Sequence, residues 1–171
     1  MRRAFVLVLL ALAGCATPSP MPTVERVDLA RFMGDWYVIA NIPTFLERGA
    51  HNAVESYRLD EDGTIATRFT FRAGSFDGAA RSYNPRGFVL DPASNALWGM
   101  QFVWPVKADY RIVYVAPGYS QTVIAREKRD YVWIMARTPA IEEAEYQRLL
   151  GIVVSLGYDP ARVQKVPQRW N

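Results

Sequence analysis

The chain has 171 residues, of which 50% are hydrophobic and 22% are charged, and this balance predicts one globular domain rather than a disordered segment. Its single cysteine and single histidine exclude an intrachain disulfide and argue against a Cys/His metal site. The formal charge of +3 falls to about +1 when Arg2 and Arg3 are left out, so we expect no nucleic-acid partner.

Residues 1–14 have the pattern of an export signal. Arg2 and Arg3 precede ten apolar residues at 4–13, which as a helix would rise only about 15 Å, half the thickness of a bilayer core. The following Cys15 ends the sequence Leu-Ala-Gly-Cys, which resembles a bacterial lipobox. In such a signal the chain is cut before the cysteine, which then carries acyl chains. The alternative is an ordinary signal peptide with an incidental cysteine.

The lipobox resemblance implies that Cys15 anchors the protein to a membrane, because two or more acyl chains make attachment stable. Ala16 stands where an Asp would favour the inner membrane, so we expect the cell outer membrane, with the domain facing the periplasm. Residues 15–23 contain three prolines and no charge, and they predict a lipidated tether. The folded domain is then expected over residues 24–171.

Alternation of apolar and polar residues predicts a chain of short strands. It is clearest from Ile65 to Arg72, where apolar or small side chains alternate with polar ones. Turn sequences such as Asp62-Gly63 and Asn84-Pro85 separate the candidates, and eight sequential strands are typical of an all-β up-and-down barrel or a sandwich. The predicted strands are 36–41, 52–59, 64–72, 80–90, 96–103, 109–115, 120–126 and 131–137.

A helix is predicted after Pro139. Apolar residues recur at helical spacing from Ile141 to Leu156, with Thr138 as the expected N-terminal cap and Gly157 as the expected end. The apolar stripe of this helix is expected to cover the outside of the barrel. Residues 28–32 are expected to form one short turn before the first strand.

Three motifs in the expected order carry a resemblance to the lipocalin family. They are Gly34-Asp35-Trp36 at the first strand, Asp130-Tyr131 before the last strand, and Arg137 at its end. The surrounding sequence resembles the bacterial outer-membrane lipoprotein lipocalins, which are related to apolipoprotein D. This resemblance implies an eight-stranded antiparallel up-and-down β-barrel with a C-terminal helix packed outside.

The motif residues are interpreted as structural. Trp36 is expected to fill the narrow end of the barrel, with the Arg137 guanidinium against its ring. Gly34 allows a tight turn into the first strand. Asp130 and Tyr131 complete the family pattern.

The resemblance also implies a cup for one small ligand. Strand parity places aromatic side chains inside it, and Phe88, Met100, Phe102 and Trp104 are expected near the cavity or its mouth. For any single residue, filling of the core is an equally good interpretation. The ligand-binding residues predicted in this way are Tyr57, Phe69, Phe71, Phe102, Trp104, Tyr110 and Trp133.

Charged residues are assigned more modest roles. One or two of Arg72, Arg81, Arg86 and Lys107 are candidates to meet an anionic head group at the mouth. Glu47 and Arg48 are interpreted as a local pair in a loop. His51 and the acidic run at 60–62 are interpreted as loop residues without catalytic or metal-binding function.

The sequence therefore predicts an outer-membrane lipoprotein that binds and stores or transports amphipathic lipids, such as fatty acids and lysophospholipids, in envelope maintenance or stress. No cofactor, metal or catalytic residue is expected, and a homodimer is left open. One alternative is an enzyme on the same scaffold that acts on a lipid or isoprenoid. The other is a structural lipoprotein whose barrel is filled by its own side chains.

Overall fold

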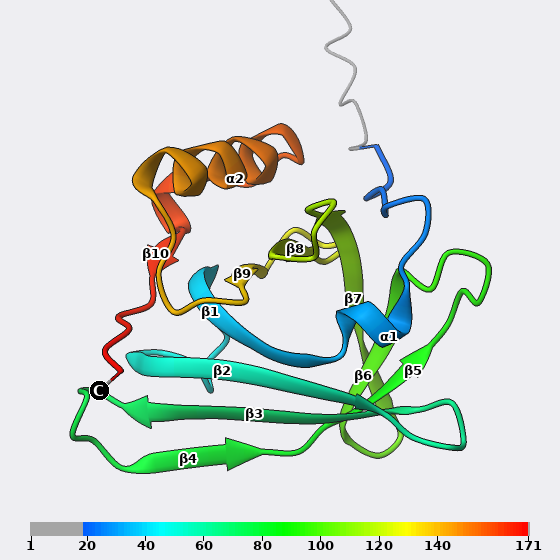
Figure 1. Ribbon diagram of the computed structural model, residues 1–171, viewed down its shortest axis with the longest axis horizontal. Coiled ribbons are helices and arrows are strands. Elements are labelled where there is room, and N and C mark those ends of the chain that lie inside the picture. The colour runs from blue at the N-terminus through cyan, green and yellow to red at the C-terminus, as the bar shows by residue number, and fades with distance from the viewer. Residues whose placement is uncertain (1–18, 171) are drawn as a thin grey trace, which may run out of the picture.

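The strands close into a barrel. The computed structural model describes residues 19–170, and in it each strand is antiparallel to its neighbours until β9 pairs again with β1 (Figure 1). The strands are β1 (Gly34–Ile42), β2 (Ala50–Leu59), β3 (Ile65–Ala73), β4 (Ala80–Tyr83), β5 (Arg86–Val89), β6 (Leu97–Val103), β7 (Val106–Val115), β8 (Gln121–Ala125) and β9 (Val132–Ala136). Because β4 and β5 both pair with β3, they share one position in the wall. The predicted eight-stranded antiparallel barrel is confirmed.

The predicted strand 80–90 is divided in two. Pro85 has no N–H to donate to a ladder, and the strand is interrupted at residues 84–85. Only β5 continues the wall to β6, whereas β4 pairs with β3 alone among the described residues. One edge of β4 is therefore free.

The inward and outward faces of the wall follow the predicted alternation. On β3, Ile65, Phe69 and Phe71 are buried in the barrel, while Arg68 and Arg72 are exposed outside it. Closure of the barrel removes the inner face of the sheet from water. The apolar face of each strand therefore becomes the inner face.

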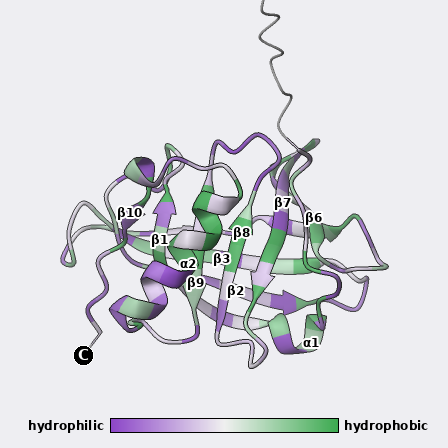
Figure 2. Ribbon diagram, turned by 90° about the horizontal axis from the view of Figure 1, so that it is seen from above, coloured by the Kyte–Doolittle hydropathy of each residue, from purple (hydrophilic) through white to green (hydrophobic). Residues whose placement is uncertain are grey.

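The helix α2 (Glu143–Ser155) covers the outer wall. Figure 2 shows it lying across β8 and β9, where Leu149 and Val153 are fully buried with outward side chains of the barrel. The predicted helix and its position are confirmed, and Gly157, at φ +89°, follows its end. The predicted cap is wrong, because the Thr138 hydroxyl donates to the Ala140 carbonyl at 2.7 Å and the helix begins after Glu142.

The two ends of the barrel differ. Alternating strand directions place the helix α1 (Leu29–Phe32) and the connections 60–64, 90–96 and 116–120 at one end, which we call the α1 end. The connections 43–49, 74–79, 104–105 and 126–131 lie at the other end, which we call the rim. The short elements η1 (Pro160–Arg162) and β10 (Gln164–Lys165) follow α2, and β10 pairs with β1.

The N-terminal segment contacts the barrel before the boundary predicted at residue 24. Met21 is buried, its N–H donates to the Glu127 carboxylate at 3.2 Å, and Arg111 donates to its carbonyl at 3.0 Å. Arg129 donates to the Ser19 carbonyl at 2.8 Å. Since residues 127 and 129 belong to a rim connection, the described chain starts beside the rim. The predicted signal and Cys15 lie outside the described residues.

Within residues 19–170, none of the helices has the length and apolar character needed to cross a membrane.

Candidate ligand-binding site

An aromatic cluster fills the α1 end. Trp36 is fully buried, its indole N–H donates to the Phe32 carbonyl at 2.8 Å, and the two ring centroids are 5.0 Å apart. Phe32 also contacts Tyr57 and Trp98, with centroid distances of 5.8 and 5.5 Å. Such tilted and edge-on pairs are the favoured geometries of aromatic rings. This end of the interior is thus occupied by the protein's own side chains.

Arg137 lies over this cluster. Its guanidinium carbon is 3.8 Å from the Trp36 ring centroid, which is cation–π geometry. The same group donates to the carbonyls of Arg31, Phe32, Met33 and Asp35. Gly34, at φ +93°, adopts a conformation that side chains rarely accept, in the turn that brings these carbonyls together.

Asp130 and Tyr131 lie far from Arg137, in a rim connection. The Asp130 carboxylate accepts the Tyr131 N–H at 3.0 Å and is 3.3 Å from the Arg126 guanidinium. Tyr158, after α2, donates to the Tyr131 carbonyl at 2.9 Å. These residues therefore tie the rim to the C-terminal segment.

Four of the predicted ligand-binding residues form part of the buried inner wall. They are Tyr57, Phe69, Phe71 and Tyr110. Tyr110 stacks on Trp98 with 5.2 Å between centroids, and Tyr57 contacts the α1-end cluster. Phe69 and Phe71 have 5.2 Å between their ring centroids; Phe69 lies at the middle of β3 and Phe71 nearer its rim end. Trp133, on β9, is half-buried against the same interior.

Phe102 and Trp104 lie elsewhere. Both belong to the tip of the β6–β7 hairpin at the rim, where their exposed fractions are 51% and 82%. Val103 and Val106 are exposed beside them, and Phe45 is exposed in another rim connection. The rim thus carries apolar side chains in contact with water. Phe88, expected near the cavity, packs under Lys107 instead, with 3.6 Å between the ammonium and the ring centroid.

A buried carboxyl group stands among the inner aromatic residues. Glu55 accepts a short hydrogen bond from the Tyr57 hydroxyl, which in turn is 2.7 Å from the Tyr110 hydroxyl. Burial raises the pKa of Glu55 to about 7, although the Tyr57 hydrogen bond acts in the opposite direction. Burial likewise holds the pKa of both tyrosines above the ordinary value.

A second buried carboxyl group belongs to Glu47, in the connection between β1 and β2. It accepts the Trp133 indole N–H and the Thr44 backbone N–H, both at 2.8 Å. Burial raises the pKa of Glu47, and its negative charge contributes to the raised pKa of Glu55. Glu47 is therefore not the partner of Arg48 that its sequence position indicates.

Sequence reasoning missed both glutamates as interior groups. Glu55 shares strand parity with Tyr57, so the alternation used for the aromatic residues would have found it. Glu47 gives no such signal because it lies in a connection. In the described part of the chain, these acids belong to no cluster of three or more side chains that could hold a metal ion.

The candidate head-group cations are dispersed. Arg86 lies 3.4 Å from Asp60, which borders an α1-end connection, and Lys107 lies on the outer wall over Phe88. Arg81 pairs in register with Phe71, and Arg72 pairs with Ala80 on the outer face. These four residues thus do not gather around one mouth.

Comparison with known proteins gives a consistent set of relatives. A family model described as "Lipocalin-like domain" matches residues 27–168. The chain is similar to "Temperature-induced lipocalin-1" from Arabidopsis thaliana, with 31% identity over 86% of this chain and 83% of the relative. It is also similar to "Outer membrane lipoprotein Blc" from Citrobacter freundii, with 27% identity over 90% and 88% of the two chains. For "Apolipoprotein D" from Bos taurus the identity is 28%, over 81% and 75%.

Solved structures share the fold. Insecticyanin from the tobacco hornworm Manduca sexta has a TM-score of 0.68 at 13% identity, covering 90% of this chain and 86% of that chain. Apocrustacyanin C2 has a TM-score of 0.66 at 13% identity, covering 83% and 80%.

Proposed function

The chain belongs to the lipocalin-like family, and on that premise we propose that it is a lipid-anchored protein that binds amphipathic lipids inside its barrel. Fatty acids and lysophospholipids are the proposed ligands. The observation that carries the proposal is the inner wall, where a closed barrel presents aromatic side chains around a small polar group. Such a mostly apolar interior with few polar groups is typical of small-molecule sites.

The rim half of the barrel is the proposed place of the acyl chain. The α1 half is occupied by packed rings around Phe32 and Trp36, so Tyr57 and Tyr110 are proposed to form the floor of the site. Phe69, Phe71 and Trp133 are then the proposed walls. Each methylene moved from water into this wall would contribute about 0.8 kcal/mol before ordering costs.

The rim is proposed to face the membrane. The described chain starts at Ser19, which is held by a rim connection, and Cys15 is four residues earlier. Four residues span at most about 14 Å, so acylation of Cys15 would keep the rim near the bilayer surface.

We propose the cell outer membrane as the location, with the domain on the periplasmic side and a role in lipid storage or transport during envelope maintenance or stress. Similarity to outer membrane lipoproteins supports this location. Binding rather than catalysis is proposed, because the relatives are lipocalins and the two buried acids serve indole, hydroxyl and backbone donors.

Lipid identification in the native protein tests this proposal. The full chain is extracted gently from membranes, and mass spectrometry measures both the mass added at Cys15 and any lipid bound without a covalent bond. We expect acylation of Cys15 and a co-purifying monoacyl lipid. A protein that carries no lipid and does not shift the fluorescence of an added fatty-acid probe would contradict the proposed function.

A further inference from the structure

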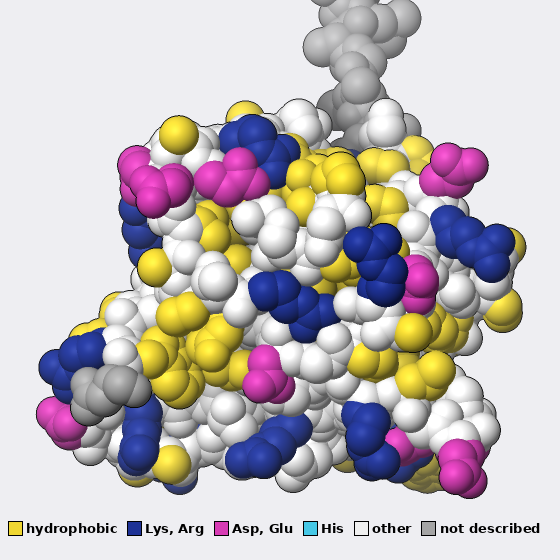
Figure 3. Space-filling view, in the orientation of Figure 1, with side chains coloured by type: hydrophobic (Ala, Val, Ile, Leu, Met, Phe, Trp, Pro, Cys, Tyr) yellow, Lys and Arg dark blue, Asp and Glu magenta, His cyan; other side chains and the backbone are white. Residues whose placement is uncertain are grey.

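A basic groove lies on the outer wall, away from the proposed lipid site. It has a volume of about 510 Å³ and spans β2, β3, β4 and the C-terminal tail. Its positive charges come from Arg68, Arg72, Arg81 and Arg169, against one acidic residue, Asp77. Figure 3 shows Lys and Arg side chains recurring along the lower part of this face, where Figure 1 places β3 and β4. The nearly neutral chain thus concentrates positive charge on one surface.

Most of this charge has no partner within residues 19–170. Arg68 and Arg81 make neither an ion pair nor a hydrogen bond there, and Arg72 makes a single 3.4 Å contact with the Gly78 carbonyl. Arg169 is 3.7 Å from Asp77, whose side chain is 96% exposed, and such an exposed pair is weak. The groove therefore presents guanidinium groups that are free to bind another anion.

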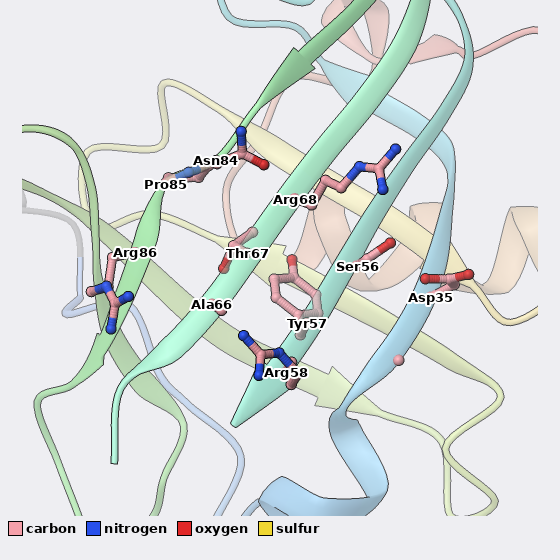
Figure 4. A pocket seen from close by; sticks show the side chains of 11 residues that line it. Asp35, Ser56, Tyr57, Arg58, Ala66, Thr67, Arg68, Asn84, Pro85 and Arg86 are labelled. Atoms are coloured by element: carbon pink, nitrogen blue, oxygen red, sulfur yellow. The ribbon is translucent and has the colours of Figure 1, made fainter. Parts of the chain in front are cut away.

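A second hollow continues the surface toward the α1 end, and two of its three arginines are already paired with a carboxylate. Figure 4 shows Arg58 on β2, Arg68 on β3 and Arg86 on β5 around it. Arg58 and Arg86 are 3.0 and 3.4 Å from Asp60. Arg68 is shared by both hollows. The capacity to bind an anion is thus concentrated beside β4.

The tail that completes the groove is fixed to the barrel. The Asn52 side chain donates to the Arg169 carbonyl at 2.8 Å and accepts the Arg169 N–H at 2.7 Å. Gln168 donates to the carbonyls of Val38 and Ala53. The Arg169 guanidinium then lies 4.2 Å from the Phe76 ring centroid. Its position is built into the fold.

The groove adjoins an unpaired strand edge. β4 pairs only with β3 in the described chain, which leaves backbone groups on its other edge for a further strand. Its outward residues Ala80 and Ser82 are small and stand opposite Arg72 and Thr70. They do not block Arg72 from reaching over β4, whereas the Arg68 side chain extends toward β2 (Figure 4). Arg81, which is in register with the inward Phe71, offers a charge on the other face of the edge.

We propose that the free edge of β4 binds an extended acidic peptide segment of a partner protein. The segment would add a strand to the sheet by backbone hydrogen bonds, and its carboxylates would meet Arg72 on the outer face or Arg81 on the other face of the edge. Pairing of two copies at this edge is disfavoured, because it would bring like charges together. In Figures 1 and 2 the tail lies on the side of the barrel away from the start of the described chain, which favours a protein partner over the anchoring membrane.

Synthetic peptides test the proposal on the full chain in zwitterionic micelles. The probe is a hexapeptide that alternates Glu and Val, and calorimetry compares it with the matching Lys and Val peptide. We expect binding of the acidic peptide alone. Two further peptides carry N-methyl groups at either the odd or the even positions. Strand pairing predicts that one of them loses binding and the other retains it, because only one set of N–H groups faces β4.

Matched variants locate the site. Arg72→Gln with Arg81→Gln should weaken the acidic peptide about tenfold, as a few-fold is lost with each exposed ion pair. The control is Arg26→Gln with Arg162→Gln. Among the described residues the Arg26 side chain makes no polar contact, and Arg162 donates to one carbonyl, that of Asp130. This control should bind as the parent does, and fatty-acid binding should be unchanged in both variants.

Three outcomes would overturn the inference. The first is equal binding of acidic and basic peptides, and the second is retained binding by both N-methylated peptides. The third is that no peptide binds, while vesicles containing phosphatidylglycerol protect residues 76–82 from hydrogen exchange. That result would assign the groove to an anionic bilayer. Because fatty-acid affinity is measured separately, none of these results depends on the proposed lipid site.

Discussion

At the scale of single residues, the family motif closes one end of the barrel. Trp36 fills the α1 end, and Arg137 joins the ring to five backbone carbonyls, that of Tyr119 included. Gly34 has the backbone conformation that this turn needs. These three positions were predictable because they match the family motif. It did not predict Phe32 as their partner, since that contact depends on where α1 lies.

Trp36→Ala should lower the free energy of unfolding by roughly 3–5 kcal/mol, because the indole is fully buried and the cavity cannot collapse. Urea titration followed by circular dichroism measures the change. Trp104→Ala is the matched control, since its indole is 82% exposed, and it should change stability by less than about 0.5 kcal/mol. Equal stability of wild type and Trp36→Ala would contradict the structural role.

Glu55 should make stability depend on pH. Its pKa is about 7 in the folded barrel and 4.5 in the reference state, so folding keeps a proton that the unfolded chain releases. Retention of this proton contributes about 3 kcal/mol to the free energy of unfolding. The contribution is fully present below pH 4.5 and is lost as the pH rises through 7.

The neutral variant Glu55→Gln should therefore match wild type at pH 4 and exceed its unfolding free energy at pH 8. Chemical denaturation at both values measures the difference. Glu61→Gln, at an exposed position, is the control and should follow the wild-type profile. Parallel profiles for wild type and Glu55→Gln would show that Glu55 does not carry the effect.

At the scale of elements, periodicity predicted the strands and the helix, whereas their ends depended on local chemistry. Asn84-Pro85 is a turn signal inside the predicted strand 80–90, and the missing N–H of Pro85 divides the wall there. Thr138 has the residue type of a cap, but the helix begins after Glu142, whose backbone is extended.

The contact between α2 and the barrel predicts a difference between two positions on one helix. Leu149 is fully buried against the outer wall, and Val154 is 45% exposed. Leu149→Ala should cost roughly 2–5 kcal/mol of unfolding free energy, whereas Val154→Ala should cost less than about 0.5 kcal/mol. Thermal unfolding of both variants measures this. Similar losses would mean that α2 is not held by its apolar stripe.

At the scale of the whole molecule, the barrel and its covering helix were predictable because the motif order spans nearly the entire domain. The site was predictable only in part. Parity separates the inner from the outer face, but it cannot tell which inner residues meet. Glu47 and Trp133 are 86 positions apart, and barrel closure alone brings them to 2.8 Å. Phe102 and Trp104 lie at the hairpin tip and are exposed to water, although their aromatic side chains would also suit a cavity wall.

The barrel as a whole is proposed to be a container that opens at the rim beside its attachment to the membrane. The α1 end is packed, the outer wall under α2 is packed, and the rim carries the exposed apolar hairpin. A lipid would then enter from the side where lipids are present. This arrangement makes Phe69, on the inner wall, the residue whose replacement most directly tests the container.

Titration of the full chain in vesicles with a fluorescent fatty acid is the most direct measurement. Phe69→Asn places an amide in the proposed acyl-chain wall, and Phe88→Asn makes the same change outside the barrel interior. We expect Phe69→Asn to weaken fatty-acid binding about tenfold or more, since a buried polar group without a partner is costly. Phe88→Asn should retain the wild-type affinity. Both variants should remain folded by circular dichroism. Equal affinity of the two folded variants, or no binding by wild type, would contradict the proposed lipid site.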